Sequence, residues 1–413
     1  MTGRKIILMT LLAALLAAGF CLSAAAEEAE NLTEKCTVKM SSHSERAKRI
    51  TDGDYRTNWE SAETENPWVT ITSPDPVYGL YLCFQKKPES YEIQRASGDD
   101  WVTVTAGDVR FHHVFYEMDG VKKIRIRATG GEKTVMGFNE IFVFGAGDIP
   151  DWVQRWEEPE GKADILFVAT HPDDDALFLG SAIIYYNTEL KKNVRVAFLT
   201  WSNTTRRSEA LNGLWTMGVR TYPDFGGFRD TFTNPTSDMK KAYKAVGGKD
   251  LVLEWITGMF RRYRPDVVVT QDMNGEYGHP QHRMLVRACT ECWDLAADPE
   301  KYPESAAAYG AWEVKKLYLH LYGDEADQTD FDWEVPLQSM GGKTANEVAE
   351  EAYAMHVTQR GQGKKFGGKF YPFSVEEYGI KRYPNNRFGL YASRVGADTE
   401  HNDFMENLNG ADE

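Results

Sequence analysis

Hydrophobic and polar residues follow two different patterns along the chain. Between residues 36 and 144, short apolar or alternating runs are separated by turn residues, which is typical of an all-β sandwich. The strands expected there are residues 68–72, 77–84, 90–94, 101–105, 123–128 and 140–144. From residue 163 onward, apolar runs typical of buried strands alternate with stretches of helical spacing, and this order predicts an α/β region.

We expect a mostly parallel sheet in the α/β region. Strands are predicted at residues 163–170, 193–200, 266–270 and 314–321, and helices at 176–190, 206–218, 251–263 and 282–297. Ligands of such sheets bind beyond the carboxyl ends of the strands, so the segments after these strands are where chemistry is expected. The pattern beyond residue 321 is weaker, with one helix predicted at 345–359, and we assign it to the same domain as a C-terminal extension.

The first residues have the pattern of a signal peptide. Arg4 and Lys5 precede an apolar run at residues 6–22, and small residues follow it up to Ala26, after which we expect cleavage. An uncleaved membrane anchor is the alternative, although the run is short for a span. The sequence therefore predicts a secreted protein with no membrane span after cleavage.

The remaining chain divides into a sandwich at residues 36–147, a linker at 148–162 and an α/β domain at 163–413. Prolines and charged residues in the linker suggest that the sandwich is an independent unit. Lys and Arg number 47 against 62 Asp and Glu, and the net charge of -15 argues against a nucleic-acid partner.

Four cysteines follow the signal segment. Cys36 and Cys83 both lie in the sandwich and could pair, because export permits disulfides. Cys289 and Cys292 have the spacing of a redox or metal half-site, but they lie in an apolar helical stretch with no second such pair. Packing inside a helix is the favoured interpretation for them.

Histidines and aspartates gather after two of the predicted strands. Residues 171–175 read His-Pro-Asp-Asp-Asp and residues 277–282 read Tyr-Gly-His-Pro-Gln-His, and together they hold three of the nine histidines. Imidazoles with a carboxylate suit a divalent ion such as Zn²⁺, and a spare carboxylate beside it could take a proton from water. Either segment alone could be a capped turn. Both together at two strand ends favour a metal site.

These motifs resemble those of the LmbE-like, or PIG-L, family of zinc-dependent N-acetylglucosaminyl deacetylases, and the resemblance spans residues 163 to about 321. It implies a Rossmann-like fold and one zinc ion per chain. The implied roles are metal binding by His171, Asp174 and His282, general base for Asp173, and transition-state stabilisation by His279 and Tyr277. Thr170, Asp175 and Gln281 replace residues common in the family, and none of the three is an implied ligand.

Two further residues are candidates for substrate binding. Arg206 matches an Arg-x-x-Glu pair of the family, and an ion pair with Glu209 at the helix end is the alternative. His356 lies in the helix predicted at residues 345–359, where it is either a substrate contact or a structural histidine.

Residues 51–59 resemble the Asp-Gly-x-x-x-Thr-x-Trp stretch of discoidin, or coagulation factor 5/8 type C, sandwiches. This resemblance implies a glycan-binding module. His43, Tyr55 and Trp59 are candidates for a sugar platform, and core packing of the aromatic rings is the alternative.

Together these features predict a secreted hydrolase that removes the N-acetyl group from an N-acetylglucosamine-type sugar in a glycan or glycoconjugate. The alternative is a non-catalytic secreted carbohydrate-binding protein with a degenerate deacetylase-like domain. Such a domain would lack a ligand or the base, and this sequence lacks neither.

Overall fold

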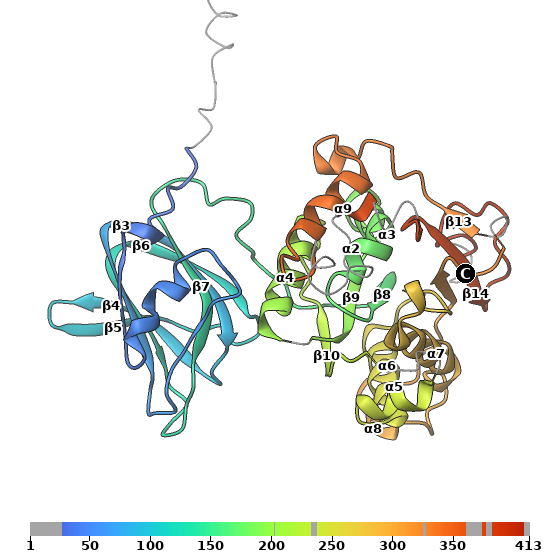
Figure 1. The fold of residues 1–413 in the computed structure, drawn as a ribbon, viewed down its shortest axis with the longest axis horizontal. Helices are drawn as coiled ribbons and strands as arrows, with labels where there is room; N and C mark the ends of the chain where they lie inside the picture. The colour runs from blue at the N-terminus through green and yellow to red at the C-terminus, as the bar shows by residue number, and fades with distance from the viewer. Residues whose placement is uncertain are drawn as a thin grey trace, which may run out of the picture.

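The chain folds into an all-β region followed by an α/β region (Figure 1). The computed structural model describes residues 27–201, 203–232, 238–324, 328–360, 374–376 and 382–408. The predicted signal peptide, residues 1–26, lies outside the described residues. Within those ranges, no helix has the length and apolar character needed to cross a membrane.

The all-β region is a β-sandwich-like unit, as the sequence predicts. Its strands are β1 (Thr37–Met40), β2 (Trp59–Glu60), β3 (Trp68–Lys86), β4 (Tyr91–Ser97), β5 (Asp100–Ala106), β6 (His113–Ala128) and β7 (Gly137–Phe144). All pairs are antiparallel, in the order β2-β7-β3-β6-β4-β5, with β1 beside β3. Two predicted strands merge into the long β3, and the first half of β6 was missed because its alternation is broken by polar residues.

The α/β region places helices between successive strands. Its elements are β8 (Ile165–Ala169), α2 (Asp174–Phe178), α3 (Gly180–Ile184), β9 (Val194–Thr200), α4 (Thr204–Thr216), β10 (Asp224–Phe228), α5 (Met239–Ala245), α6 (Lys249–Tyr263), β11 (Val267–Thr270), α7 (Pro280–Leu295), α8 (Pro303–Tyr309), β12 (Lys316–His320), β13 (Gln328–Asp330), α9 (Ala345–Ala354) and β14 (Arg387–Ser393). The single helix predicted at 176–190 is broken into α2, α3 and a π-helical turn at Tyr185–Glu189.

Strand order in this sheet creates a crevice next to β8. The order is β10-β9-β8-β11-β12-β14-β13, and the pairs from β10 to β12 are parallel, whereas β14 is antiparallel to both neighbours. The chain moves outward from β8 to β10 and then returns to β11 on the other side. Connections diverge at such a point, so the carboxyl ends of β8 and β11 frame an open edge.

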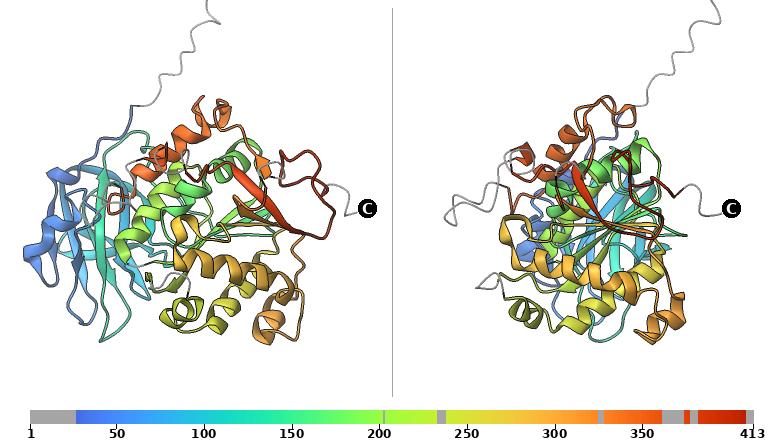
Figure 2. Two further views of the ribbon diagram at one scale, coloured as in Figure 1. Left: turned by 45° about the vertical axis from the view of Figure 1, so that its right-hand side comes forward. Right: turned by 90° about the vertical axis from the view of Figure 1, so that its right-hand side faces the viewer.

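Both faces of the sheet are covered, which explains the continuous apolar strands. Ile165 and Phe167 of β8 pack in the core shared with α2, α3, α4 and α9, while Leu166 and Val168 pack in the core shared with α5, α6 and α7. Figure 2 shows these two helical layers on opposite sides of the sheet. Cys289 and Cys292 lie in the second core, and all four cysteines of the described residues are unpaired.

A buried polar interface joins the two regions at α4. Nη2 of Arg207 donates to the carbonyl oxygens of Phe84 and Gln85 in the sandwich, at 3.0 Å each. Nε2 of His113, a fully buried residue of β6, lies 3.2 Å from the Ser208 hydroxyl. Charged and polar groups of both regions therefore satisfy one another out of water.

The segment predicted as a linker is packed into this interface. Val153 and Trp156 are buried, and Gln154 joins His113, at 2.8 Å, to Asn212 of α4, at 2.6 Å. Its proline and charged residues suggested an exposed linker. Those residue types do not indicate whether the apolar residues of the segment pack against other parts of the chain. The segment predicted as a linker therefore has buried contacts with both regions.

The two aromatic residues considered for a sugar platform, Tyr55 and Trp59, pack against other parts of the protein. The indole of Trp59 is fully buried, stacks on Phe138 and donates to the Ser42 carbonyl at 2.9 Å, so this ring packs in the core and is not part of a surface platform. Tyr55 stacks on His113 at the interface with the α/β region. Core packing, the alternative considered for these rings, is what the structure shows for Trp59.

We predict that Arg207→Met lowers the free energy of unfolding by about 2–4 kcal/mol, because two buried carbonyl groups lose their donor. Arg262→Met is the matched control, since that side chain is 45% exposed and 3.4 Å from Asp224. It should change stability by less than about 1 kcal/mol. Thermal and urea unfolding of both variants measure this, and equal effects would show that the interface contributes little.

Candidate active site

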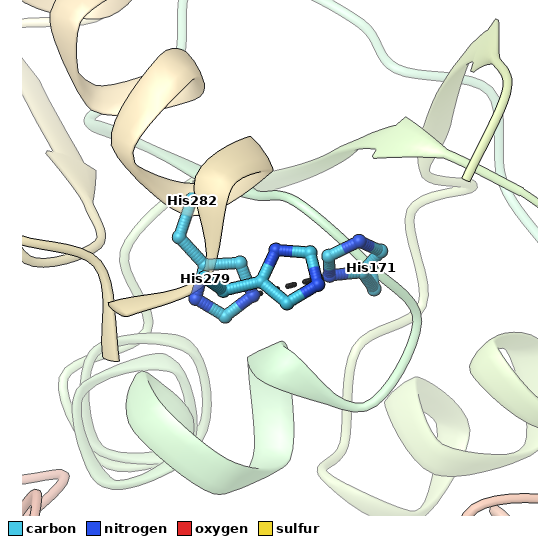
Figure 3. A group of neighbouring side chains, drawn as sticks. All are labelled: His171, His279 and His282. Atoms are coloured by element: carbon cyan, nitrogen blue, oxygen red, sulfur yellow. Dashed lines mark hydrogen bonds between the residues drawn. The ribbon is translucent and has the colours of Figure 1, made fainter. Parts of the chain in front are cut away.

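The predicted site residues converge where β8 and β11 end. The two strands are parallel neighbours, so the segments that follow them meet at the same edge. His171 and Asp173 lie in the turn between β8 and α2, and His279 and His282 lie at the start of α7 after β11. Figure 3 shows the three histidine rings gathered there, with a hydrogen bond between His171 and His282.

Three potential ligand atoms form a small triangle. Nδ1 of His171 lies 3.0 Å from Oδ2 of Asp174 and 3.1 Å from Nε2 of His282, and those last two atoms are 3.3 Å apart. Tetrahedral coordination with bonds of about 2.0–2.1 Å separates ligand atoms by about 3.3 Å. The triangle therefore has nearly the dimensions of one face of a zinc coordination shell.

The charge of the site also suits a cation. Burial disfavours a charged imidazole, but Asp174 and Glu276 outweigh burial and raise the pKa of His282 to about 10. Burial likewise opposes ionisation of Asp174, yet His282 and His171 hold the pKa of its carboxyl well below the usual range. The buried carboxylates of Asp174 and Glu276 therefore favour a positive charge between them. A bound metal ion would supply that charge.

His279 is a less suitable ligand than Asp174. His171, His279 and His282 offer ligand atoms within 4.8 Å of one another, a wider spacing than the triangle with Asp174. Nδ1 of His279 accepts the backbone N–H of Gln281 at 3.2 Å and so caps α7. Because Nδ1 accepts this bond, the proton of the neutral ring is on Nε2, which then has no lone pair for a metal ion, and this favours a role beside the metal site rather than in it.

Asp173 stands apart from the triangle and is held under strain. Its φ is 117°, a conformation unfavourable for a residue with a side chain. Its Oδ1 accepts Nη2 of Arg206 at 3.0 Å, and its backbone N–H donates to Asp175 at 3.0 Å. Burial raises the pKa of Asp173 well above the usual range, Arg206 opposes this, and Asp174 and Asp175 add to it. A carboxyl with high proton affinity suits proton transfer.

Arg206 holds Asp173 and its surroundings together. Besides Asp173, its guanidinium donates to Oδ2 of Asp230 at 2.9 Å and to the Pro172 carbonyl, and its side chain is 7% exposed. The helix-end pair with Glu209 is not formed, because Glu209 accepts from Thr358 instead.

His356 is not at the open edge of the site. It is fully buried beside Gly213 of α4, and neither ring nitrogen has a partner within the part of the chain that the structure describes. Burial lowers the pKa of this histidine to about 3. Its surroundings are those of a packed residue.

Sequence reasoning missed the residues that orient the predicted ligands. Glu276 accepts from Nδ1 of His282 at 2.7 Å, and Gln281 lies 3.2 Å from Nε2 of His171. Asp230, in the loop after β10, is 3.5 Å from the same nitrogen of His171. No strand was predicted at β10, so the position of Asp230 gave no signal in the sequence, and a lone acid in a turn, such as Glu276, gives none either.

Residues 166–293 match the protein family described as "PIG-L: GlcNAc-PI de-N-acetylase". The α/β region is thus similar to the PIG-L family over these residues. The chain is 29% identical over 185 residues to 1D-myo-inositol 2-acetamido-2-deoxy-alpha-D-glucopyranoside deacetylase 1 of Catenulispora acidiphila, covering 39% of this chain and 56% of the relative. The corresponding Geodermatophilus obscurus deacetylase is 29% identical over 182 residues, covering 37% and 60%. The chain thus spans less than two thirds of the length of either relative.

Similarity to solved structures is weaker. A chitosan-binding module from a Paenibacillus chitosanase/glucanase is 26% identical, covers 28% of this chain and 99% of the module, and gives a TM-score of 0.25. A conserved protein of Thermus thermophilus is 17% identical, covers 57% of this chain and 97% of that chain, and gives a TM-score of 0.39.

We predict that His171→Ala and His282→Ala each abolish tight zinc binding, because each removes one corner of the ligand triangle. Elemental analysis after dialysis measures bound zinc per chain. His43→Ala is the control, since that histidine is exposed in the sandwich. Full zinc occupancy in both site variants would contradict the ligand assignment.

Proposed function

We propose that this protein is a secreted, zinc-dependent hydrolase that removes the N-acetyl group from an N-acetylglucosamine-type sugar in a glycan or glycoconjugate. The observation that carries the proposal is the ligand triangle of His171, Asp174 and His282 with Asp173 beside it. We interpret the strand order of the α/β sheet as Rossmann-like, with the site at the edge where such folds bind ligands.

Asp173 performs the proton transfers of the proposed reaction. A bound zinc ion supplies Lewis acidity toward the amide carbonyl and lowers the pKa of water. Asp173 accepts a proton from the attacking water as the bond to the carbonyl carbon forms. It then returns that proton to the sugar nitrogen, and the C–N bond breaks to give acetate and the free amine.

His279 serves as a hydrogen-bond donor to the carbonyl oxygen. Its Nδ1 accepts from the Gln281 backbone, so in the neutral ring the proton is on Nε2. Burial, together with His282 and His171, lowers the pKa of His279 well below the usual range, which keeps the ring neutral. Tyr277, whose ring meets that of His279 edge-on at 5.7 Å, lines the same side of the site. Both residues thus stabilise developing negative charge.

The substrate class is supported by the two curated relatives, whose names describe deacetylation of a 2-acetamido-2-deoxyglucopyranoside. Secretion is supported by the signal-peptide pattern at residues 1–26, and glycan attachment by the discoidin-like motif at residues 51–59.

We predict that Asp173→Asn retains zinc but lowers turnover by about 10²–10⁴, because an amide cannot accept the proton. Steady-state kinetics and zinc analysis on the same preparation measure both quantities. Asp294→Asn is the matched control, since its carboxylate is 85% exposed on α7. Unchanged turnover for the Asp173 variant would require a different base.

We predict that a panel of N-acetylated sugars releases free amine with the zinc-loaded protein. The panel should contain N-acetylglucosamine, its β1,4-linked oligomers, an N-acetylglucosaminyl inositol and an O-acetylated glucose as the ester control. Amine release is assayed with an amine-reactive dye, and acetate release is assayed in parallel. Acetate from the ester alone would refute amide hydrolysis as the function.

A further inference from the structure

We propose that Glu276 and His320 form a positioning unit that orients the metal ligand His282 and ties it to the C-terminal segment. This inference rests on the proposed metal site. Neither residue belongs to the two motifs that define the site in the sequence, and both are fully buried.

Glu276 joins two histidines through its two carboxylate oxygens. Oε2 accepts from Nδ1 of His282 at 2.7 Å, and Oε1 accepts from Nδ1 of His320 at 2.7 Å. The backbone N–H of Asp272 donates to Oε1 at 3.0 Å, and the amide of Gln271 lies 3.3 Å from Oε2. With donors on both oxygens, the carboxylate has one orientation.

This orientation fixes the tautomer of the metal ligand. A carboxylate only accepts hydrogen bonds, so the ring proton of His282 is on Nδ1. Nε2 then presents its lone pair toward His171 and Asp174, from which it is 3.1 and 3.3 Å away. Ligating histidines require this arrangement, because the nitrogen that faces the metal must be unprotonated.

His320 is the second histidine that contacts the Glu276 carboxylate. Its Nδ1 faces the carboxylate, and its Nε2 lies 3.1 Å from the carbonyl oxygen of Pro384. Both partners are acceptors only, so each ring nitrogen of His320 faces an acceptor. Glu276 and His320 therefore form a buried hydrogen-bonded pair, and Nε2 is the nitrogen of His282 that remains to face a metal ion.

The same contact anchors the C-terminal segment behind the site. Pro384 precedes Asn385, whose carbonyl accepts the Ser181 hydroxyl of α3 at 2.8 Å. The ring of Tyr383 meets Phe178 of α2 edge-on at a centroid distance of 6.0 Å. This segment thus contacts both the helices after β8 and the histidine at the end of β12.

The test measures how fast zinc leaves the protein. Zinc-loaded wild type, Glu276→Ala, His320→Ala and His320→Gln are mixed with a chromophoric chelator, and the release rate is recorded. Loss of a partner that orients a ligand typically costs 10–100-fold in metal affinity, so we expect release to be about 10–100-fold faster in both alanine variants. His320→Gln keeps one donor toward Glu276 and should be intermediate. His43→Ala should match wild type.

A second measurement needs no variant. Histidine ring nitrogens of the metal-free, ¹⁵N-histidine-labelled protein are observed by NMR, and Nδ1 of His320, which faces Glu276, should carry a proton. Release rates equal to wild type in all folded variants, or an unprotonated Nδ1 on His320, would overturn the inference. If the wild-type protein bound no zinc at all, the proposed function would fail instead, and the NMR result would still decide whether His320 donates to Glu276.

Discussion

Burial of carboxylates beside the open sheet edge is the constraint on which the site depends. Asp174 and Glu276 lie almost without solvent contact, and a buried carboxylate must be neutralised or hydrogen-bonded to remain charged. Imidazoles of His171, His282 and His320 surround the two acids. These rings lie within hydrogen-bonding distance of the two carboxylates. A metal ion at the ligand triangle would supply positive charge beside the same acids, so the burial that constrains the fold also prepares a cation site.

The parallel sheet brings the candidate site residues together, and the turns that contain them have strained backbone conformations. Parallel neighbours β8 and β11 bring two short segments together although a hundred residues separate them. Asp173 and Tyr277, one from each segment, have φ of 117° and 48°. Such conformations cost about 1–3 kcal/mol each and persist only where the surroundings enforce them. Arg206 and Asp175 hold Asp173 in place, and Tyr277 lies in the 3-10 turn Glu276–Gly278 that precedes α7, so the strain lies at the residues assigned to chemistry.

The sequence located the candidate site residues better than the residues that orient them. Strand ends and motif spacing located His171, Asp173 and His282, because ligands must follow strands that end at one edge. Glu276 and His320 were missed because a single acid in a turn and a histidine ending a strand are both ordinary features. Which carboxylate faces which ring depends on side-chain contacts between distant segments, and no local pattern encodes these.

Helix α4 shows how the two regions of the chain are joined. Thr205, Ser208 and Asn212 recur every three or four residues on this helix and bond to the sandwich or to the packed linker. Arg206 and Glu209 form the next row and bond to Asp173 and to Thr358 of the C-terminal extension. Because residues three or four apart share one face of a helix, the two rows of α4 contact different partners. A rigid helix that binds both neighbours at once makes the position of the base depend on the sandwich, so a region that is separate in sequence becomes part of the support of the site.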